Sequence, residues 1–259
     1  MKNKQFKIEL LTPALCHGAD KNAEIRVPSI RGHLRKWHTI LWGKDDMEYC
    51  WGTAGKDDTI ASKVVLRIVT DSANLAVFST SMLPHKKSAL TNAVKNNQSF
   101  VLEVSYRYLE DDKRQSVINK VEKTIELWLL LGTFGQRGTR AFGSVWNQEA
   151  SLATPQSYID AVKAILKTSK YAVQVFKSNK PANMNEILKS CTDTIGGHPD
   201  LLGDIKPRQT SPLKMKTIKL KGEYFLVLHA VNHSIIDNTI KLLQNKPVGK
   251  NFTVIASNK

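Results

Sequence analysis

The stretch Leu129–Val145, LLLGTFGQRGTRAFGSV, follows an apolar helical run and ends in a second apolar pattern. Arg137 and Arg140 lie among four glycines, which are Gly132, Gly135, Gly138 and Gly143. Glycine permits positive φ and lets other backbone approach closely, and arginine presents a planar fork that suits phosphates. The stretch therefore predicts a helix, a glycine-rich turn and a strand. The turn either contacts a polyanion or carries two solvated arginines.

Two common nucleotide-binding motifs do not fit this glycine pattern. The chain has no Gly-Lys-Ser/Thr triplet here, so the turn is not a Walker loop. The glycines follow a predicted helix, whereas those of a dinucleotide-binding fingerprint follow a strand. A contact with a polyanion is therefore a better functional interpretation than a mononucleotide site.

The net positive charge of the chain also favours contact with a polyanion. Its 259 residues include 38 lysines and arginines but only 23 aspartates and glutamates, which gives a net charge of +15. The excess is present in both halves of the sequence and is not confined to a tail. Such a charge favours nucleic acid or an acidic surface as the partner.

Cysteine usage and hydropathy narrow the class of protein further. Cys16, Cys50 and Cys191 lie far apart, and none forms a CxxC or Cys/His pair with zinc-site spacing. We expect reduced thiols in a cytoplasmic protein that needs no metal or other cofactor. No apolar stretch approaches about 18 residues, so we expect no membrane partner.

Hydrophobic periodicity predicts an alternation of strands and helices. The expected strands are Phe6–Leu11, Lys63–Val69, Phe100–Tyr108, Phe142–Asn147, Tyr171–Phe176, Leu213–Leu220, Tyr224–Val231 and Phe252–Ala256. The expected helices are Ser29–Gly43, Gln115–Leu131, Pro155–Ser169, Asn183–Cys191 and Ser234–Gln244. Lys44–Thr59 and Thr194–Gln209 are expected to be loops, and Ser81–Ser88 an exposed loop.

The order β-α-β-β-α-β thus occurs twice, which is the ferredoxin-like pattern also used by RNA-recognition domains. We predict an α+β protein with two tandem ferredoxin-like domains, residues 1–150 and 151–259. The first would contain the glycine-rich loop 132–145. The aromatic signature of RNA-recognition domains is absent, because Tyr106 and Tyr108 match it only loosely.

Catalytic motifs are not evident in the sequence. No serine or cysteine occupies a recognisable nucleophile elbow, and no spacing singles out a histidine pair for acid–base cleavage of RNA. The carboxylates of Asp45, Asp46 and Glu48, like those of Asp57 and Asp58, are interpreted as solvated loop charge. We expect a protein that is not an enzyme.

Three motifs resemble the RAMP superfamily of CRISPR effector proteins. The first is Leu11–Trp42, LTPALCHGADKNAEIRVPSIRGHLRKWHTILW, with its Thr-Pro, Gly-Ala-Asp and Arg-x-Pro-Ser-Ile-Arg-Gly-x-Leu-Arg-x-Trp segments. The second is Gly132–Val145, where Ala141 stands in a position at which the family more often has glycine. The third is Pro207–Leu213, similar to an Arg-x-x-Ser-Pro segment. Within the superfamily, the resemblance is greatest to the first-numbered subunits of type III-B, or Cmr, complexes.

This resemblance implies two fused ferredoxin-like domains that bind guide RNA or target RNA and assemble with other RAMP subunits. Base pairing would read the sequence while the protein recognises shape and backbone, as in other guided systems. The residues expected to contact RNA are Arg26, Arg31, Arg35, Lys36, Lys63, Lys86, Gly135, Arg137, Gly138, Arg140 and Arg208.

Asp20 lies in the loop where related backbone subunits carry a catalytic aspartate. In the subunits that this chain resembles most, the same aspartate is not expected to cut RNA, and it would brace the loop or pair with Arg26 or Arg31. The expected function is therefore a non-catalytic RNA-binding subunit. Two alternatives are a RAMP-type RNA endonuclease that uses Asp20 or a histidine, and an assembly subunit that contacts only protein.

Overall fold

The computed structural model of the chain describes residues 3–18, 20, 22–54, 59–69, 75–86, 88–107, 109–167, 170–194, 198–204 and 209–259. Arg208, one of the residues expected to contact RNA, lies outside these ranges. No helix in the described part of the chain is both long and apolar enough to pass through a bilayer.

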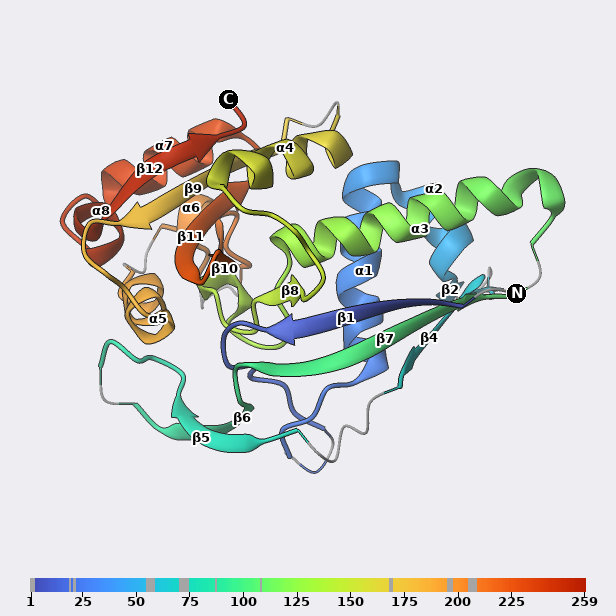
Figure 1. Cartoon of the computed structure of the whole chain (residues 1–259), viewed down its shortest axis with the longest axis horizontal. Helices are drawn as coiled ribbons and strands as arrows, with labels where there is room; N and C mark the ends of the chain where they lie inside the picture. Colours follow the sequence, from blue (N-terminus) through green and yellow to red (C-terminus); the bar gives the residue numbers. More distant parts are fainter. Residues whose placement is uncertain are drawn as a thin grey trace.

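The first sheet is built from strands that are distant in the sequence. Its order is β4-β7-β1-β8, and each neighbouring pair is antiparallel. The strands are β1 (Lys4–Leu10), β4 (Val64–Ile68), β7 (Gln98–Tyr106) and β8 (Val145–Asn147). Helices α1 (Val27–Trp42) and α3 (Asp111–Leu131) supply the two crossovers and cover one face of this sheet (Figure 1).

The second sheet repeats that arrangement. Its order is β10-β11-β9-β12, again with antiparallel neighbours. The strands are β9 (Ala172–Ser178), β10 (Lys214–Leu220), β11 (Glu223–Ala230) and β12 (Phe252–Ser257). The helices of this half are α4 (Pro155–Ile165), α5 (Met184–Thr192), α6 (Pro199–Leu202), α7 (His233–Leu242) and α8 (Pro247–Asn251).

Both sheets place the first and third strands of a β-α-β-β-α-β unit at the centre, which is the ferredoxin-like arrangement. The predicted fold class is therefore confirmed. The first sheet ends at Asn147 and α4 begins at Pro155, on either side of the boundary that the sequence suggests.

Two predictions of loops are wrong. Residues 44–51 form helix α2 (Lys44–Trp51), between Gly43 and Gly52. Its acidic start favours the N-terminal end of a helix, and Met47, Cys50 and Trp51 are buried along one side. The apolar spacing of three and four residues is the helical signal that the nearby carboxylates obscured. The second region, Thr194–Gln209, contains the short helix α6.

Two hairpins complete the first half. Strands β2 (Thr53–Ala54) and β3 (Thr59–Ile60) pair with each other beyond α2. Strands β5 (Val77–Ser81) and β6 (Leu90–Val94) form a longer hairpin that runs below the second half, toward α5 (Figure 1). Phe78 and Met82 of this segment pack against a second buried cluster, most of whose members belong to the second half.

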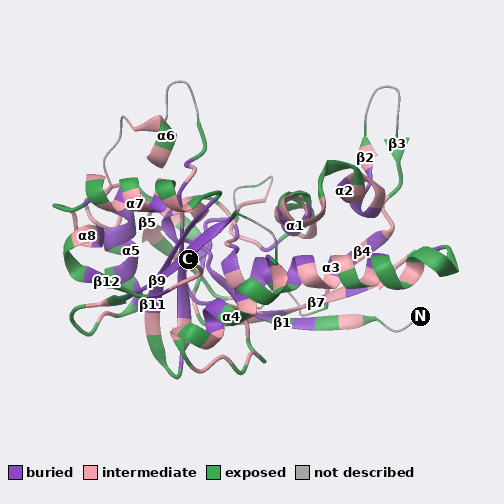
Figure 2. Cartoon of the chain, turned by 90° about the horizontal axis from the view of Figure 1, so that it is seen from above, coloured by how far each residue is buried: buried purple, intermediate pink, exposed green. Residues whose placement is uncertain are grey.

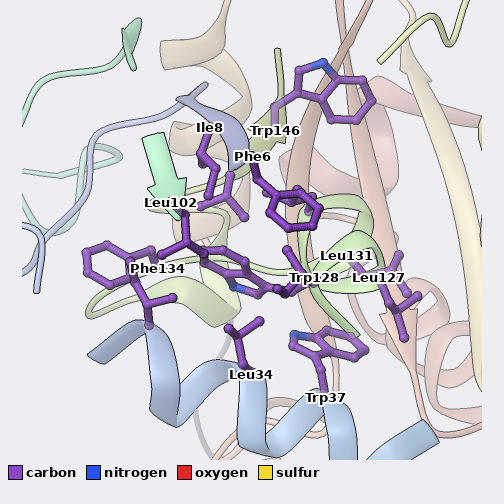
Figure 3. Close-up of a cluster of buried hydrophobic side chains, with 14 of the residues drawn as sticks. Phe6, Ile8, Leu34, Trp37, Leu102, Leu127, Trp128, Leu131, Phe134 and Trp146 are labelled. Carbon is purple, nitrogen blue, oxygen red and sulfur yellow. The ribbon is translucent and has the colours of Figure 1, made fainter. Parts of the chain in front are cut away.

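One hydrophobic core joins the two halves. Figure 3 shows Trp128 of α3 between Leu34 of α1 and the side chains of β1. The same cluster includes Tyr158 of α4 and Val175 of β9. Figure 2 shows this buried layer continuing from the first sheet into the second. The inner face of the second sheet therefore packs against the helices of the first half, which fixes how the two halves are arranged.

Candidate nucleic-acid interface

The glycine-rich loop lies where the two halves meet, and its backbone is closely packed. Gly135 has φ +85°, and an added Cβ would stand 2.7 Å from the carbonyl oxygen of Leu15. At Gly143 the φ is +61°, and a Cβ would stand 1.8 Å from the carbonyl oxygen of Phe134. No other residue type fits either place, which is the physical reason for glycines here. The predicted sequence of helix, glycine-rich turn and strand is confirmed, with a short 3-10 turn at Gly138–Arg140.

Two residues of the loop other than glycine also adopt left-handed backbone. Arg137 has φ +56° and Ala141 has φ +66°. The carbonyl oxygen of Ala141 accepts hydrogen bonds from Thr12 Oγ1 at 2.6 Å and Ser144 Oγ at 2.8 Å. These bonds hold Ala141 in the conformation that glycine, the family's more frequent residue here, would adopt without strain.

Arg140 is buried, at 9% exposure, and its guanidinium group forms hydrogen bonds within the protein. Its guanidinium donates to Thr194 Oγ1 at 3.2 Å, Ser211 Oγ at 3.2 Å and the carbonyl oxygen of Leu202 at 3.1 Å. Burial lowers the pKa of Arg140 to about 10, with a smaller contribution from the nearby Arg137. Arg140 thus connects the loop to the second half and has few donors left for a phosphate.

Lys216 of β10 makes a second connection of the same kind. Its fully buried ammonium donates to the carbonyl oxygens of Leu129 at 2.6 Å, Gly132 at 2.9 Å and Val145 at 2.5 Å. Leu129 and Gly132 lie at the C-terminal end of α3, where a helix presents unpaired carbonyls and negative partial charge. Sequence reasoning missed Lys216, because its strand reads as an ordinary basic β segment.

Lys36 and Lys214 lie near enough to each other, on either side of the junction of the two halves, for their charges to repel. Lys36 lies on α1 and is exposed, whereas Lys214 begins β10 and is half-buried. Withdrawal from solvent lowers the pKa of Lys214 to about 7, and repulsion by Lys36 and Arg140 lowers it further in the same direction. Within the described residues, neither lysine has a carboxylate at ion-pair distance. The Lys214 amine donates to the carbonyl oxygen of Ser211, and a bound anion would favour its ammonium form beside Lys36.

Arg137 and Lys86 add exposed cations near the same junction. Arg137 stands at the exposed tip of the glycine-rich loop, and Lys86 at the tip of the β5–β6 hairpin. Both are close enough to His85 to lower its pKa, after the larger effect of burial. No ion pair neutralises either side chain within the part of the chain described here.

A further set of cations lies on the other side of α1. Arg31 donates to Ser62 Oγ at 2.8 Å, and Arg35 to the carbonyl oxygen of Gly52 at 2.6 Å. Burial lowers the pKa of Arg31, followed by repulsion from Arg35 and Arg107. Lys63 directly precedes β4, and its Nζ lies 5.7 Å from the centre of the Tyr49 ring. Sequence reasoning did not single out Arg107, whose position becomes evident only when β7 pairs with β4.

Of the two roles expected for Asp20, bracing its own loop or pairing with an arginine, its hydrogen bonds match the first, and Arg26 pairs with a different residue. Arg26 is exposed and pairs with Glu24, at 3.2 Å. The carboxylate of Asp20 accepts from the backbone and side chain of Asn22. These two bonds lower the pKa of Asp20, and Arg26 adds a weaker effect. Asp20 therefore braces its own turn.

One cluster of potential metal ligands lies within the first half, contrary to what the spacing of the sequence suggested. His38, Asp46 and Cys50 bring their donor atoms within 4.8 Å of one another. Asp46, expected to be solvated loop charge, accepts from His38 Nε2 at 2.9 Å and contacts Lys120. The sequence signal that could have revealed this cluster is the separation of four residues between Asp46 and Cys50, which places both on one side of a helix. All three cysteines are free and buried, as expected for reduced thiols.

Comparisons with known proteins place this architecture in a family. The crystal structure of Cmr1 from Pyrococcus furiosus (apo form) is similar with a TM-score of 0.53 at 18% sequence identity, covering 89% of this chain and 88% of that one. A chain in the cryo-EM structure of Type III-B Cmr-beta bound to cognate target RNA has a TM-score of 0.56 at 11% identity, over 88% of this chain and 94% of that one.

The same assembly with AMPPnP and in the presence of ssDNA has a TM-score of 0.59 at 11% identity, over 93% and 98% of the two chains. The search of curated proteins gave no match. The family model described as "RAMP superfamily" matches residues 7–146, which include the first predicted motif, most of the first sheet and the glycine-rich loop. With more than half of its length matched in this way, the chain belongs to the RAMP superfamily.

Proposed function

We propose that this protein is a non-catalytic, RNA-binding subunit of a type III CRISPR effector ribonucleoprotein. Its ligand is guide RNA or target RNA, held by the backbone phosphates, and its protein partners are other RAMP subunits. The observation that carries this proposal is the mutual repulsion of Lys36 and Lys214, neither of which has a carboxylate at ion-pair distance among the described residues.

The surroundings of that pair support an extended ligand. Arg137 and Lys86 continue the exposed positive charge along the junction, and Arg31, Arg35 and Lys63 provide more on the other side of α1. Charges spaced over several elements suit a polyanion, which presents a phosphate at every nucleotide, more than a small anion. Gly135 and Gly138, also expected to contact RNA, would act indirectly by shaping the loop, because an added Cβ would stand 2.7 Å from the carbonyl oxygen of Leu15 and 2.4 Å from Thr133 Oγ1.

Structural neighbours support the setting of the proposal. The printed descriptions of two of them name Cmr-beta bound to cognate target RNA. Their fold over nearly the whole chain is the one found here, so a comparable position in an assembly of RAMP subunits is geometrically available. Cytoplasmic residence, as expected from the sequence, is part of the same proposal.

The test is a double substitution, Lys36→Ala/Lys214→Ala, measured by fluorescence anisotropy with single-stranded RNA over a salt series. Each lost phosphate contact should lower the slope of log affinity against log salt by about one unit. The matched control is Lys163→Ala/Lys180→Ala, which removes the same charge from exposed positions of the second half. Equal slopes for the two double variants would contradict the proposal.

The enzymatic alternative uses Asp20 as the cutting residue. Hydrogen bonds from Asn22 occupy its carboxylate, and we find no favourable observation for catalysis among the described residues. The assay is cleavage of guide-paired target RNA, with and without divalent metal, by the wild-type chain and by Asp20→Ala within the assembled complex. Cleavage that Asp20→Ala abolishes, with binding retained, would replace the non-catalytic role.

A further inference from the structure

Three side-chain donor atoms, one from α1 and two from α2, converge inside the first half. His38 comes from α1, while Asp46 and Cys50 are four residues apart on α2 and therefore share one side of that helix. His38 Nε2 lies 2.9 Å from Asp46 Oδ1, and Cys50 Sγ lies 3.6 Å from the same oxygen. Nitrogen, oxygen and sulfur thus surround one small space.

Two residues of helix α3 contact the side chains of this cluster. Thr124 Oγ1 lies 3.0 Å from His38 Nδ1, and Lys120, four residues earlier, contacts Asp46 Oδ2. A histidine whose second ring nitrogen is held by a hydrogen bond, and a carboxylate whose second oxygen is held, are the features that orient ligands in metal centres. The atoms that remain directed at the shared space are His38 Nε2, Asp46 Oδ1 and Cys50 Sγ.

The set of donors selects the kind of cation. Imidazole and thiolate beside one carboxylate suit Zn²⁺, whereas Ca²⁺ and Mg²⁺ take oxygen ligands. His38 and Cys50 are completely buried, but the Asp46 side chain retains 23% exposure. Solvent therefore reaches the cluster on the Asp46 side, where a water molecule can complete a tetrahedral set.

We propose that His38 Nε2, Asp46 Oδ1 and Cys50 Sγ form a binding site for one Zn²⁺ ion. Binding releases the thiol proton of Cys50 to solvent and moves the ring proton of His38 from Nε2 to Nδ1, where Thr124 Oγ1 accepts it, and the thiolate and carboxylate together balance the charge of the cation. Without the ion, His38 and Cys50 donate hydrogen bonds to Asp46. With it, the ion ties α1, which carries Arg31 and Lys36, to α2.

The test uses the purified full chain, treated with a chelator and then titrated with Co²⁺ as a spectroscopic substitute for Zn²⁺. We expect a thiolate-to-cobalt charge-transfer band that saturates at about one ion per chain and disappears when Zn²⁺ is added. Added Zn²⁺ should also raise the melting temperature, since it binds only the folded site. Absence of the band in the wild-type chain would overturn the proposal, and this measurement needs no variant.

Variants then assign the band to these residues. Cys50→Ser should remove it, whereas Cys191→Ala, at another buried cysteine, should leave it unchanged. Thr124→Val removes the hydrogen bond that orients the His38 ring, and it should weaken Zn²⁺ affinity about tenfold or more. A band that survives Cys50→Ser would place the metal at a different cysteine and refute the site, and circular dichroism verifies that each variant is folded.

Discussion

At Arg140 and Lys216, positive charge is buried among hydroxyls and backbone carbonyls, and no ion-pair partner is found in the described ranges. At Lys36 and Arg137, positive charge faces solvent. The first two side chains connect the halves of the molecule, and the second two are available to a ligand. At the residue scale, burial thus separates cations that hold the fold together from cations that we propose to hold RNA.

Arg140→Met should destabilise the protein by about 1–3 kcal/mol, because the carbonyl of Leu202 and the hydroxyl of Ser211 lose their donor while buried. Urea denaturation followed by circular dichroism measures the change. The salt dependence of RNA binding should stay as in the wild type. The comparison is Arg137→Ala, which should reduce that dependence by about one unit without affecting stability. If Arg140→Met altered the salt slope and left stability unchanged, the guanidinium would be a phosphate contact after all.

Lys214 should make RNA binding depend on pH. Its pKa is lowered to about 7 in the free protein, first by burial and then by Lys36 and Arg140. A bound phosphate favours the ammonium form and raises this pKa, so binding takes up a proton above neutral pH. Affinity should therefore fall as the pH rises through the free value, and Lys214→Arg should flatten that fall. Binding measured by anisotropy on both sides of neutrality provides the check. Parallel profiles for wild type and Lys214→Arg would exclude this lysine as the titrating contact.

At the element scale, α2 and the β5–β6 hairpin are the parts that the sequence did not reveal. Helix α2 is short and begins with acidic residues, so its apolar side is visible only as three positions, Met47, Cys50 and Trp51. The hairpin has a mixed pattern because one side packs on the second half and the other faces solvent. Leu90, at 69% exposure, illustrates the exposed side.

Trp51→Ala should destabilise the protein by about 3–5 kcal/mol, the cost of removing a large buried aromatic side chain. A loop at 44–51 would tolerate the change, whereas the packed helix α2 does not. Thermal unfolding followed by circular dichroism distinguishes the two cases. Leu90→Ser, at an exposed position of the hairpin, is the comparison and should change stability by less than about 0.5 kcal/mol. A negligible effect of Trp51→Ala on stability would show that α2 is not packed in the core.

At the scale of the whole molecule, the two ferredoxin-like halves share one large buried cluster, and a second buried cluster lies mainly in the second half. Trp37 of α1 packs against Tyr171 with ring centres 5.8 Å apart and against His229 at 5.9 Å. Tyr158 donates to the carbonyl oxygen of Leu130 at 2.7 Å. The two topological units therefore depend on each other for burial.

Unfolding should consequently be a single cooperative transition. All five tryptophans lie at or before Trp146, so their fluorescence reports on the first half and, through Trp37 and Trp146, on its contacts with the second, whereas far-ultraviolet circular dichroism reports on the backbone of both. Coincident urea transitions by the two methods are expected for one unit. Lys216→Met, which breaks the connection to α3, should shift both transitions together. Separate midpoints in the wild-type chain would show that the halves unfold independently.

The sequence by itself determined the secondary-structure order, the duplicated β-α-β-β-α-β pattern and the position of the glycine-rich loop, because apolar periodicity and glycine placement are local properties. It also determined an excess of positive charge. Only the tertiary structure decided which charges are available, since burial of Arg140 and Lys216 depends on contacts between segments far apart in the chain. The pairing of Lys36 with Lys214 and the convergence of His38 with Asp46 and Cys50 likewise exist only after the elements pack. Spacing along a chain constrains what one helix or strand presents, but long-range packing decides which elements meet.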